Sequence, residues 1–275
     1  MAKQELAVRD NFNIVTGYED MDEDLRAELR DEMDDLDEES GISARKIKIP
    51  QGSSSSFEVE QDDPDDTESM KEIEGVILFT HRMNAWWEDK FGEGDNAGSQ
   101  PPTCSAMDGK TGTNPTAGTS QICETCPHNQ FRADGSGKDC KNMRRIYLLM
   151  SGQPNIYVLS VPPTSIKDIN RQLTRIMAGA KIPYTKMVVR LTLAKAVNKG
   201  GIKYNKVVLE KAGVLPDAMA TKTQELRCGL KEQYKNFAIT DEDYAAPAEA
   251  AAPPKADEDG FVQVDDAVTE ALPFN

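Results

Sequence analysis

Histidine is scarce in this sequence of 275 residues, in which only His81 and His128 occur. Histidine is the side chain most often used for proton transfer in enzymes, because its pKa lies near neutral pH. The sequence also shows no nucleophile beside a base, no glycine-rich phosphate loop and no cluster of carboxylates typical of catalysis. We therefore predict a binding protein and not an enzyme.

Long apolar runs are absent as well. No stretch approaches the roughly 20 apolar residues of a transmembrane helix, and the first residues, Met-Ala-Lys-Gln-Glu-Leu, lack the apolar segment of a signal peptide. We expect a cytoplasmic protein without a membrane partner.

The few cysteines are unevenly placed. Four of the five lie between positions 104 and 140, in a stretch rich in Gly, Asn, Ser, Thr and Pro that offers little for a packed core. Cys123-Glu-Thr-Cys126 has the C-x2-C spacing that lets two thiolates reach one tetrahedral Zn²⁺, and a single cysteine flanks it on each side. The sequence predicts a structural zinc site formed by Cys104, Cys123, Cys126 and Cys140.

Other interpretations of these cysteines remain open. His128 follows Cys126 by two residues and is an alternative ligand. A disulfide framework requires an oxidising compartment, a redox C-x-x-C is expected at a strand–helix junction, and unrelated free thiols are a further alternative. A catalytic zinc is disfavoured because four protein ligands leave no position for water. Cys228, in a segment with a helical pattern, is expected to be a core thiol.

Basic residues are in the minority, with 32 Lys and Arg against 47 Asp and Glu and a net charge of -15. Residues 1–69 carry 7 basic and 22 acidic side chains, residues 70–240 carry 24 and 15, and residues 241–275 carry 1 and 10. A basic centre between two acidic arms favours a body that binds a polyanion. The alternative is that the arms serve only solubility.

The N-terminal arm shows three patterns. Apolar residues recur at helical spacing within the acidic segment 18–39, and we expect this helix to pack its apolar stripe on the body. A β-hairpin over 46–60 follows, and then an acidic linker over 61–69. The residues of the stripe are Met21, Leu25, Leu29, Met33 and Leu36.

The body contains five predicted strands and two predicted helices. A helix begins at Thr164 or Ser165 as its cap and is closed by Gly179, and a last helix covers 217–237. The strands comprise residues 72–80, 144–150, 155–161, 187–196 and 202–209.

Five strands with a helix between the third and the fourth is the element order of an OB-fold, a barrel that commonly binds oligonucleotides. We predict a mainly β fold with helices (α+β): an OB-fold-like five-stranded barrel with a zinc-binding loop inserted after the first long strand. The domains that follow are an acidic N-terminal arm at 1–69, a body at 70–240 with the zinc loop at 92–141, and a disordered acidic tail at 241–275.

Basic and aromatic residues interleave along the predicted barrel, as single-strand binding requires. Cations follow the phosphates, and aromatic faces stack on bases without reading sequence. Trp86 and Trp87 are adjacent, so in a strand one of them should leave the core; core packing is the competing interpretation for each aromatic residue. The candidate DNA-binding residues are Trp86, Trp87, Phe131, Arg144, Arg145, Tyr147, Tyr157, Arg171, Arg175, Tyr184, Lys186, Arg190, Lys195, Lys199, Lys203, Tyr204 and Lys206.

Longer segments around the cysteines carry a resemblance, namely Glu72-Ile-Glu-Gly-Val76, Cys104-Ser-Ala-Met-Asp-Gly109, Cys123-Glu-Thr-Cys126-Pro-His-Asn-Gln-Phe131 and Gly137-Lys-Asp-Cys140-Lys-Asn142. The family that they resemble consists of zinc-containing, OB-fold-type single-stranded DNA-binding proteins of phages and mobile elements. The resemblance covers about residues 40–210 and implies Zn²⁺ as cofactor, single-stranded DNA as partner and a bacterial host cell as location.

The end of the chain is similar to the acidic tip of bacterial single-stranded DNA-binding proteins, which finish in acids followed by Ile-Pro-Phe and recruit replication and repair enzymes. The acids here are fewer and more dispersed, and Asn275 follows the phenylalanine. The similarity implies that the tail recruits replication or recombination proteins through Asp265, Asp266, Leu272, Pro273 and Phe274.

These patterns together predict a sequence-tolerant single-stranded DNA-binding protein of phage or mobile-element DNA replication or recombination. The alternative is a zinc-containing transcription or RNA-polymerase accessory protein, in which the acidic arms contact proteins and nucleic acid is secondary. A nuclease is disfavoured because acid–base residues are few.

Overall fold

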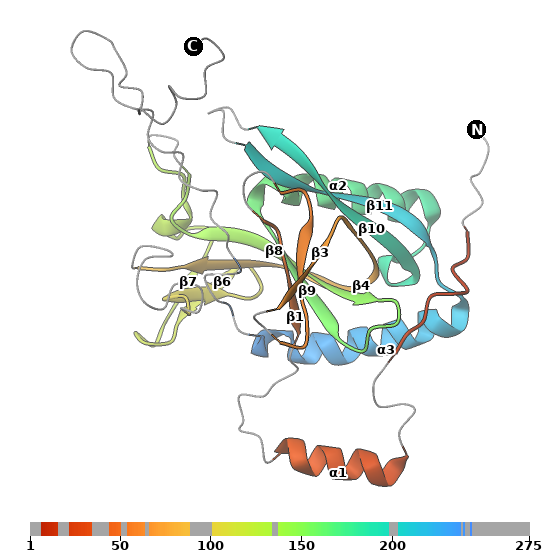
Figure 1. Ribbon diagram of the computed structural model, residues 1–275. Coiled ribbons are helices and arrows are strands. Elements are labelled where there is room, and N and C mark those ends of the chain that lie inside the picture. Colours follow the sequence, from red (N-terminus) through yellow and green to blue (C-terminus); the bar gives the residue numbers. More distant parts are fainter. Residues whose placement is uncertain are drawn as a thin grey trace, which may run out of the picture.

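The computed structural model of the chain is mainly β with a few helices, which confirms the predicted α+β class (Figure 1). In the described part of the chain, no helix is long and apolar enough to cross a membrane. The residues that the structure describes are 7–15, 22–34, 44–50, 54–63, 66–88, 101–133, 137–197, 203–237, 239 and 243.

The central strand is β4 (Glu72–Trp86), which pairs antiparallel with β8 (Lys141–Met150). β8 pairs in turn with β9 (Ile156–Val161), so the predicted hairpin is confirmed. β4 is longer than the predicted strand at 72–80. The backbone pairing with β8 continues beyond Thr80, and Met83 and Ala85 are fully buried, whereas Arg82 is exposed.

The second predicted hairpin consists of β10 (Met187–Val197) and β11 (Lys203–Val214). β10 also pairs with residues 72–76 of β4, on the edge of β4 that β8 does not use. The helix α2 (Pro163–Ala180) connects β9 to β10, and α3 (Asp217–Gln233) follows β11. The predicted order of strands and helices in the body is therefore confirmed.

The sheet is open in the described residues. β9 does not pair with β11; its free edge pairs in parallel with β1 (Arg45–Lys48), and β1 pairs with β2 (Phe57–Glu60). The predicted N-terminal hairpin is thus confirmed, and it lengthens the sheet. The predicted acidic linker at 61–69 is wrong in part, because β3 (Thr67–Met70) adds a further strand to β2 and Met70 packs on the main core.

Side chains of α2 accept hydrogen bonds from backbone N–H groups on the outer edge of β11. The N–H of Val207 donates to Ser165 Oγ at 3.1 Å, and the N–H of Leu209 donates to Gln172 Oε1 at 3.1 Å. Ser165 therefore does not cap α2 as predicted, and the helix begins at Pro163. Its C-terminal cap is Lys181, in the left-handed conformation, and not Gly179.

The two long helices cover opposite faces of the sheet (Figure 1). Ile169 and Leu173 of α2 join the largest apolar cluster together with Ile77 of β4. Leu230 of α3 packs on Leu78 of the same strand from the other side. A bulge in the β4–β8 pairing between Ile77 and Phe79 interrupts the alternation, so that the adjacent Leu78 and Phe79 both join the cluster that contains Leu230 of α3.

The acidic N-terminal helix is α1 (Glu23–Asp34), with Asp22 Oδ1 accepting the N–H of Leu25 at its start. Leu25, expected to pack on the body, is 42% exposed. Met21 and Leu36 of the predicted stripe lie outside the described residues.

Candidate functional site

The stretch predicted as an irregular zinc loop is a small extension of the sheet, here named the cysteine module (residues 101–133 and 137–140). Its first strand pairs with the end of β4, so that Trp86 lies opposite Cys104. Its elements are β5 (Cys104–Ala106), β6 (Thr111–Asn114), β7 (Thr119–Ile122) and the short helix η1 (Pro127–Asn129).

The structure brings the four predicted cysteines to one cavity of about 110 Å³, which Cys104, Cys123, Cys126 and Cys140 all line. All four are free thiols. A Cβ at Gly112 would lie 2.8 Å from Cys104 Sγ and 3.7 Å from Cys123 Sγ, so the cavity requires glycine there. Cys228, expected in the core, is exposed on α3.

The thiols also interact electrostatically. Burial, followed by the charges of the neighbouring Cys123, Cys126 and Cys104, raises the pKa of Cys140 to about 12. Burial raises the pKa of Cys104 as well, followed by the charges of Cys123 and Cys126. In the described residues, no three His, Cys, Asp or Glu side chains already form a group that could hold a metal ion.

A network of asparagine amides joins the module to the sheet. Asn142 Nδ2 of β8 donates to Asn84 Oδ1 of β4 at 2.7 Å and to Asn129 Oδ1 of η1 at 2.9 Å. Asn129 Nδ2 donates to the carbonyl of Cys123 at 2.7 Å, and Asn84 Nδ2 donates to the carbonyl of Gly109 at 3.1 Å. The position of the cysteine knuckle is therefore coupled to β4 and β8.

The tryptophan pair divides between two environments, as the alternation of strand residues predicts. Trp87 is 9% exposed and packs with Met83 and Met143. Trp86 is half-buried and stacks on His128, with ring centroids 4.0 Å apart and an interplanar angle of 21°. His128, considered above only as a metal ligand, thus belongs to an aromatic pair at the edge of the cavity.

Phe131 is 73% exposed on the same module. Lys138 Nζ lies 5.0 Å from its ring centroid, so a cation and an aromatic ring stand together at the surface. Lys138 was not among the predicted DNA-binding residues, although Phe131 of the same segment was.

Arg144 of β8 lies directly opposite Arg82 of β4. Arg82 was not among the predicted DNA-binding residues, because the first strand was expected to end at Thr80. Arg144 Nη1 donates to Thr80 Oγ1 at 3.1 Å, and its buried Nε has no acceptor. Burial lowers the pKa of Arg144, and the charge of Arg82 lowers it further. Among the described residues, neither guanidinium forms an ion pair with an acid.

Three predicted DNA-binding residues are instead buried. Arg145 is 2% exposed, and its Nη2 donates to Asp243 Oδ2 at 2.7 Å, while Ser160 Oγ donates to the other oxygen at 3.0 Å. Tyr147 and Tyr157 are 0% and 2% exposed. Their side chains are not available to a nucleic acid in this structure.

Tyr147 belongs to an aromatic layer between the sheet and the C-terminal end of α3. It stacks near His81 and Phe79, and the T-shaped contact with Phe237 closes the layer. His81 Nδ1 must donate to the carbonyl of Arg82 at 2.9 Å, so its Nε2 accepts the Tyr147 hydroxyl at 3.2 Å. Burial lowers the pKa of His81, consistent with a neutral ring.

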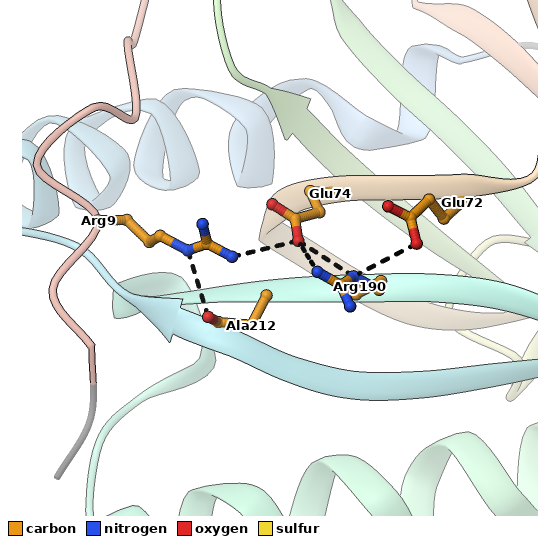
Figure 2. A network of polar contacts seen from close by, with 5 residues as sticks. All are labelled: Arg9, Glu72, Glu74, Arg190 and Ala212. Carbon is orange, nitrogen blue, oxygen red and sulfur yellow. Dashed lines mark hydrogen bonds and ion pairs between the residues drawn. The ribbon is translucent and has the colours of Figure 1, made fainter.

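Arg190 is neutralised by acids of β4 (Figure 2). Its Nη2 lies 2.6 Å from Glu74 Oε1 and its Nε lies 3.6 Å from Glu72 Oε2, while Arg9 reaches the same Glu74 oxygen at 3.3 Å. The hydrogen bond to Glu74 raises the pKa of Arg190 above its usual value. Arg190 of β10 lies opposite Glu74 of β4, and Glu74 is eight residues from Arg82 along β4, which is roughly 25 Å in a strand.

The other predicted cations lie on α2 and around the β10–β11 hairpin. Arg171 and Lys206 both pair with Asp168, and Tyr184 accepts a hydrogen bond from Arg227. Tyr204 is half-buried. Lys199 and the tail residues Asp265, Asp266, Leu272, Pro273 and Phe274 lie outside the described residues. The exposed cations of this group are Arg171, which pairs with Asp168, and Arg175, Lys186, Lys195 and Lys203.

Comparison of the chain with family models, curated proteins and solved structures found no match.

Asp243→Asn should lower the free energy of unfolding by about 3–5 kcal/mol, because it removes the charge of a carboxylate that pairs with the buried Arg145. Urea denaturation measures the change. Asp168→Asn, which removes an acid from a more exposed pair, should cost much less. Equal small losses in both variants would show that the Arg145–Asp243 pair is open to water.

Proposed function

We propose that this protein binds single-stranded DNA without reading its sequence, as part of phage or mobile-element replication or recombination. The observation that carries the proposal is the surface where β4 and β8 meet the cysteine module. Aromatic rings (Trp86 with His128, and Phe131) and cations without acidic partners (Arg82 and Arg144) occur there together. Single-strand binders need both, since rings stack on bases and cations hold the phosphates.

The arrangement of strands supports the same proposal. β4, β8 and β9 correspond in order to strands one to three of an OB-fold, and α2, β10 and β11 to its helix and last two strands. In such folds the loop between strands one and two is one of the oligonucleotide-binding elements. Here the cysteine module occupies that connection. We interpret the body as an OB-like barrel opened where β1 and α2 replace the closing contact.

Fluorescence anisotropy with labelled oligo-dT and with a duplex of equal length tests the proposal. The protein should prefer the single strand, and the logarithm of its affinity should fall with the logarithm of salt concentration by about 0.7 per phosphate contacted. Trp86→Ala should weaken binding about tenfold, as expected for the loss of one stacked base. Equal or tighter binding of the duplex would refute the single-strand proposal.

We also propose that Cys104, Cys123, Cys126 and Cys140 hold one structural Zn²⁺. The donors suit the metal, because four thiolates are a common structural zinc set and all four line one cavity. Binding the metal would offset the electrostatic cost of placing thiolates together, and four protein ligands leave no position for catalytic water. The Trp86–His128 stack and the asparagine network would then depend on the folded module.

Native mass spectrometry should find one Zn²⁺ per chain. Cys126→Ser should release the metal and make residues 101–140 sensitive to protease, while hydrogen exchange in β8 to β11 stays slow. Cys228→Ser, which removes the exposed cysteine of α3, is the matched control and should keep the metal. Folded wild-type protein purified without metal would contradict the zinc proposal.

The acidic tail is proposed to recruit replication or recombination proteins through Leu272, Pro273 and Phe274, with Asp265 and Asp266 read by a basic rim on the partner. Positions 241–275 carry 1 basic and 10 acidic residues, and the acids other than Asp243, which pairs with Arg145, are proposed to compete with phosphate for cations of the body.

Deletion of residues 262–275 should strengthen oligo-dT binding modestly at low salt, because competing charge is removed, and should abolish capture of replication or recombination partners. A chain with the same residues in scrambled order preserves the charge and is the control. The scrambled chain should bind DNA as weakly as wild type but should not capture the partners. Retention of every partner by the truncated chain and by Phe274→Ala would leave the tail with a solubilising role only.

A further inference from the structure

Two arginines face each other across β4 and β8 without a carboxylate between them. Arg82 and Arg144 are direct cross-strand partners in the antiparallel pairing. Like charges in such positions repel and reduce stability. Several other arginines of the described residues pair with acids, as Arg190 does with Glu74 and Arg145 with Asp243.

The surroundings leave donors of this pair unused. Arg144 has one described hydrogen bond, to the neutral hydroxyl of Thr80, and its buried Nε has no acceptor. Burial and the neighbouring Arg82 both disfavour its charged form, which is the direction in which the pKa of Arg144 is shifted. A buried donor without an acceptor costs free energy until a ligand supplies one.

The cysteine module packs against the base of the Arg82 side chain. Gly109 has a φ of +67°, and a Cβ there would lie 2.8 Å from the Cβ of Arg82, so only glycine permits this contact. The Arg82 side chain itself is exposed. Trp86 follows on the same face of β4, two alternations further along, where it stacks on His128.

We propose that Arg82 and Arg144 form a phosphate-binding site that takes one phosphodiester of the bound strand, with bases of that strand continuing along β4 toward Trp86. This inference rests on the proposed function for the source of the phosphate. An anion between the two guanidinium groups removes their repulsion and accepts from their free N–H donors in bidentate fashion. The proposed phosphate site is separate from Arg190, which pairs with acids near the other end of β4.

The first measurement is thermal unfolding of the full chain in sodium phosphate and in sodium chloride at equal ionic strength. Without phosphate, Arg82→Gln should unfold at the same or a higher temperature than wild type, because repulsion is relieved. Phosphate should raise the Tm of wild type more than that of Arg82→Gln or Arg144→Gln. Lys211→Gln removes an exposed charge from β11 and should respond like wild type. Equal phosphate responses in all four proteins overturn the site.

The second measurement separates a strand from free phosphate. Oligo-dT affinity should fall about tenfold in Arg82→Gln and Arg144→Gln, and the salt slope should decrease by about 0.7, the value for one phosphate contact. Arg82→Lys should recover part of the affinity, since it keeps charge without the planar fork. If wild type binds oligo-dT but both glutamine variants bind equally well, the site does not hold the strand. If wild type binds no single strand, the proposed function fails, and a remaining phosphate-specific Tm difference assigns the pair to free phosphate.

Discussion

The backbone hydrogen bonds of β4 are the constraint on which the other features depend. One edge of the strand pairs with β8 from Gly75 to Ala85, the other edge pairs with β10 near its start, and its last residues pair with β5. Both faces are covered as well, by α2 on one side and α3 on the other. A strand paired on both edges and buried on both faces has little freedom to move. Its end is therefore a rigid support for the cysteine module and for Trp86.

Charge compensation separates the arginines of the body into two groups. Arg145 and Arg190 find carboxylates, one from the C-terminal segment and one from the neighbouring strand, so their charges serve the fold. Arg82 and Arg144 instead lie opposite each other on neighbouring strands. A polyanion gains most from the second group, because a cation already paired with an acid must give up that partner before it binds phosphate. Counting basic residues along the sequence does not reveal this difference.

Side-chain hydrogen bonds at the outer edge of β11 explain why the sheet stays open. A barrel closes when its first and last strands satisfy each other's free N–H and C=O groups. Here Ser165 and Gln172 of α2 accept N–H groups of β11, while Asn205 of β11 donates to the carbonyls of Pro50 and Ser54 near the β1–β2 turn. The edge is thus covered without a strand on it. The N-terminal hairpin contributes its Phe57 to the main core, so it belongs to the body as much as to the acidic arm.

The sequence alone determined the α+β class, the order of the body's strands and helices, and the grouping of the cysteines, because alternation, turn residues and short spacings are local. It also indicated that Trp86 and Trp87 face opposite sides. Only the tertiary structure decided that Arg145 is buried against Asp243, 98 positions away in sequence, and that Arg82 stands opposite Arg144. Burial and ion pairing depend on which distant segments meet, and residue type and spacing do not specify that.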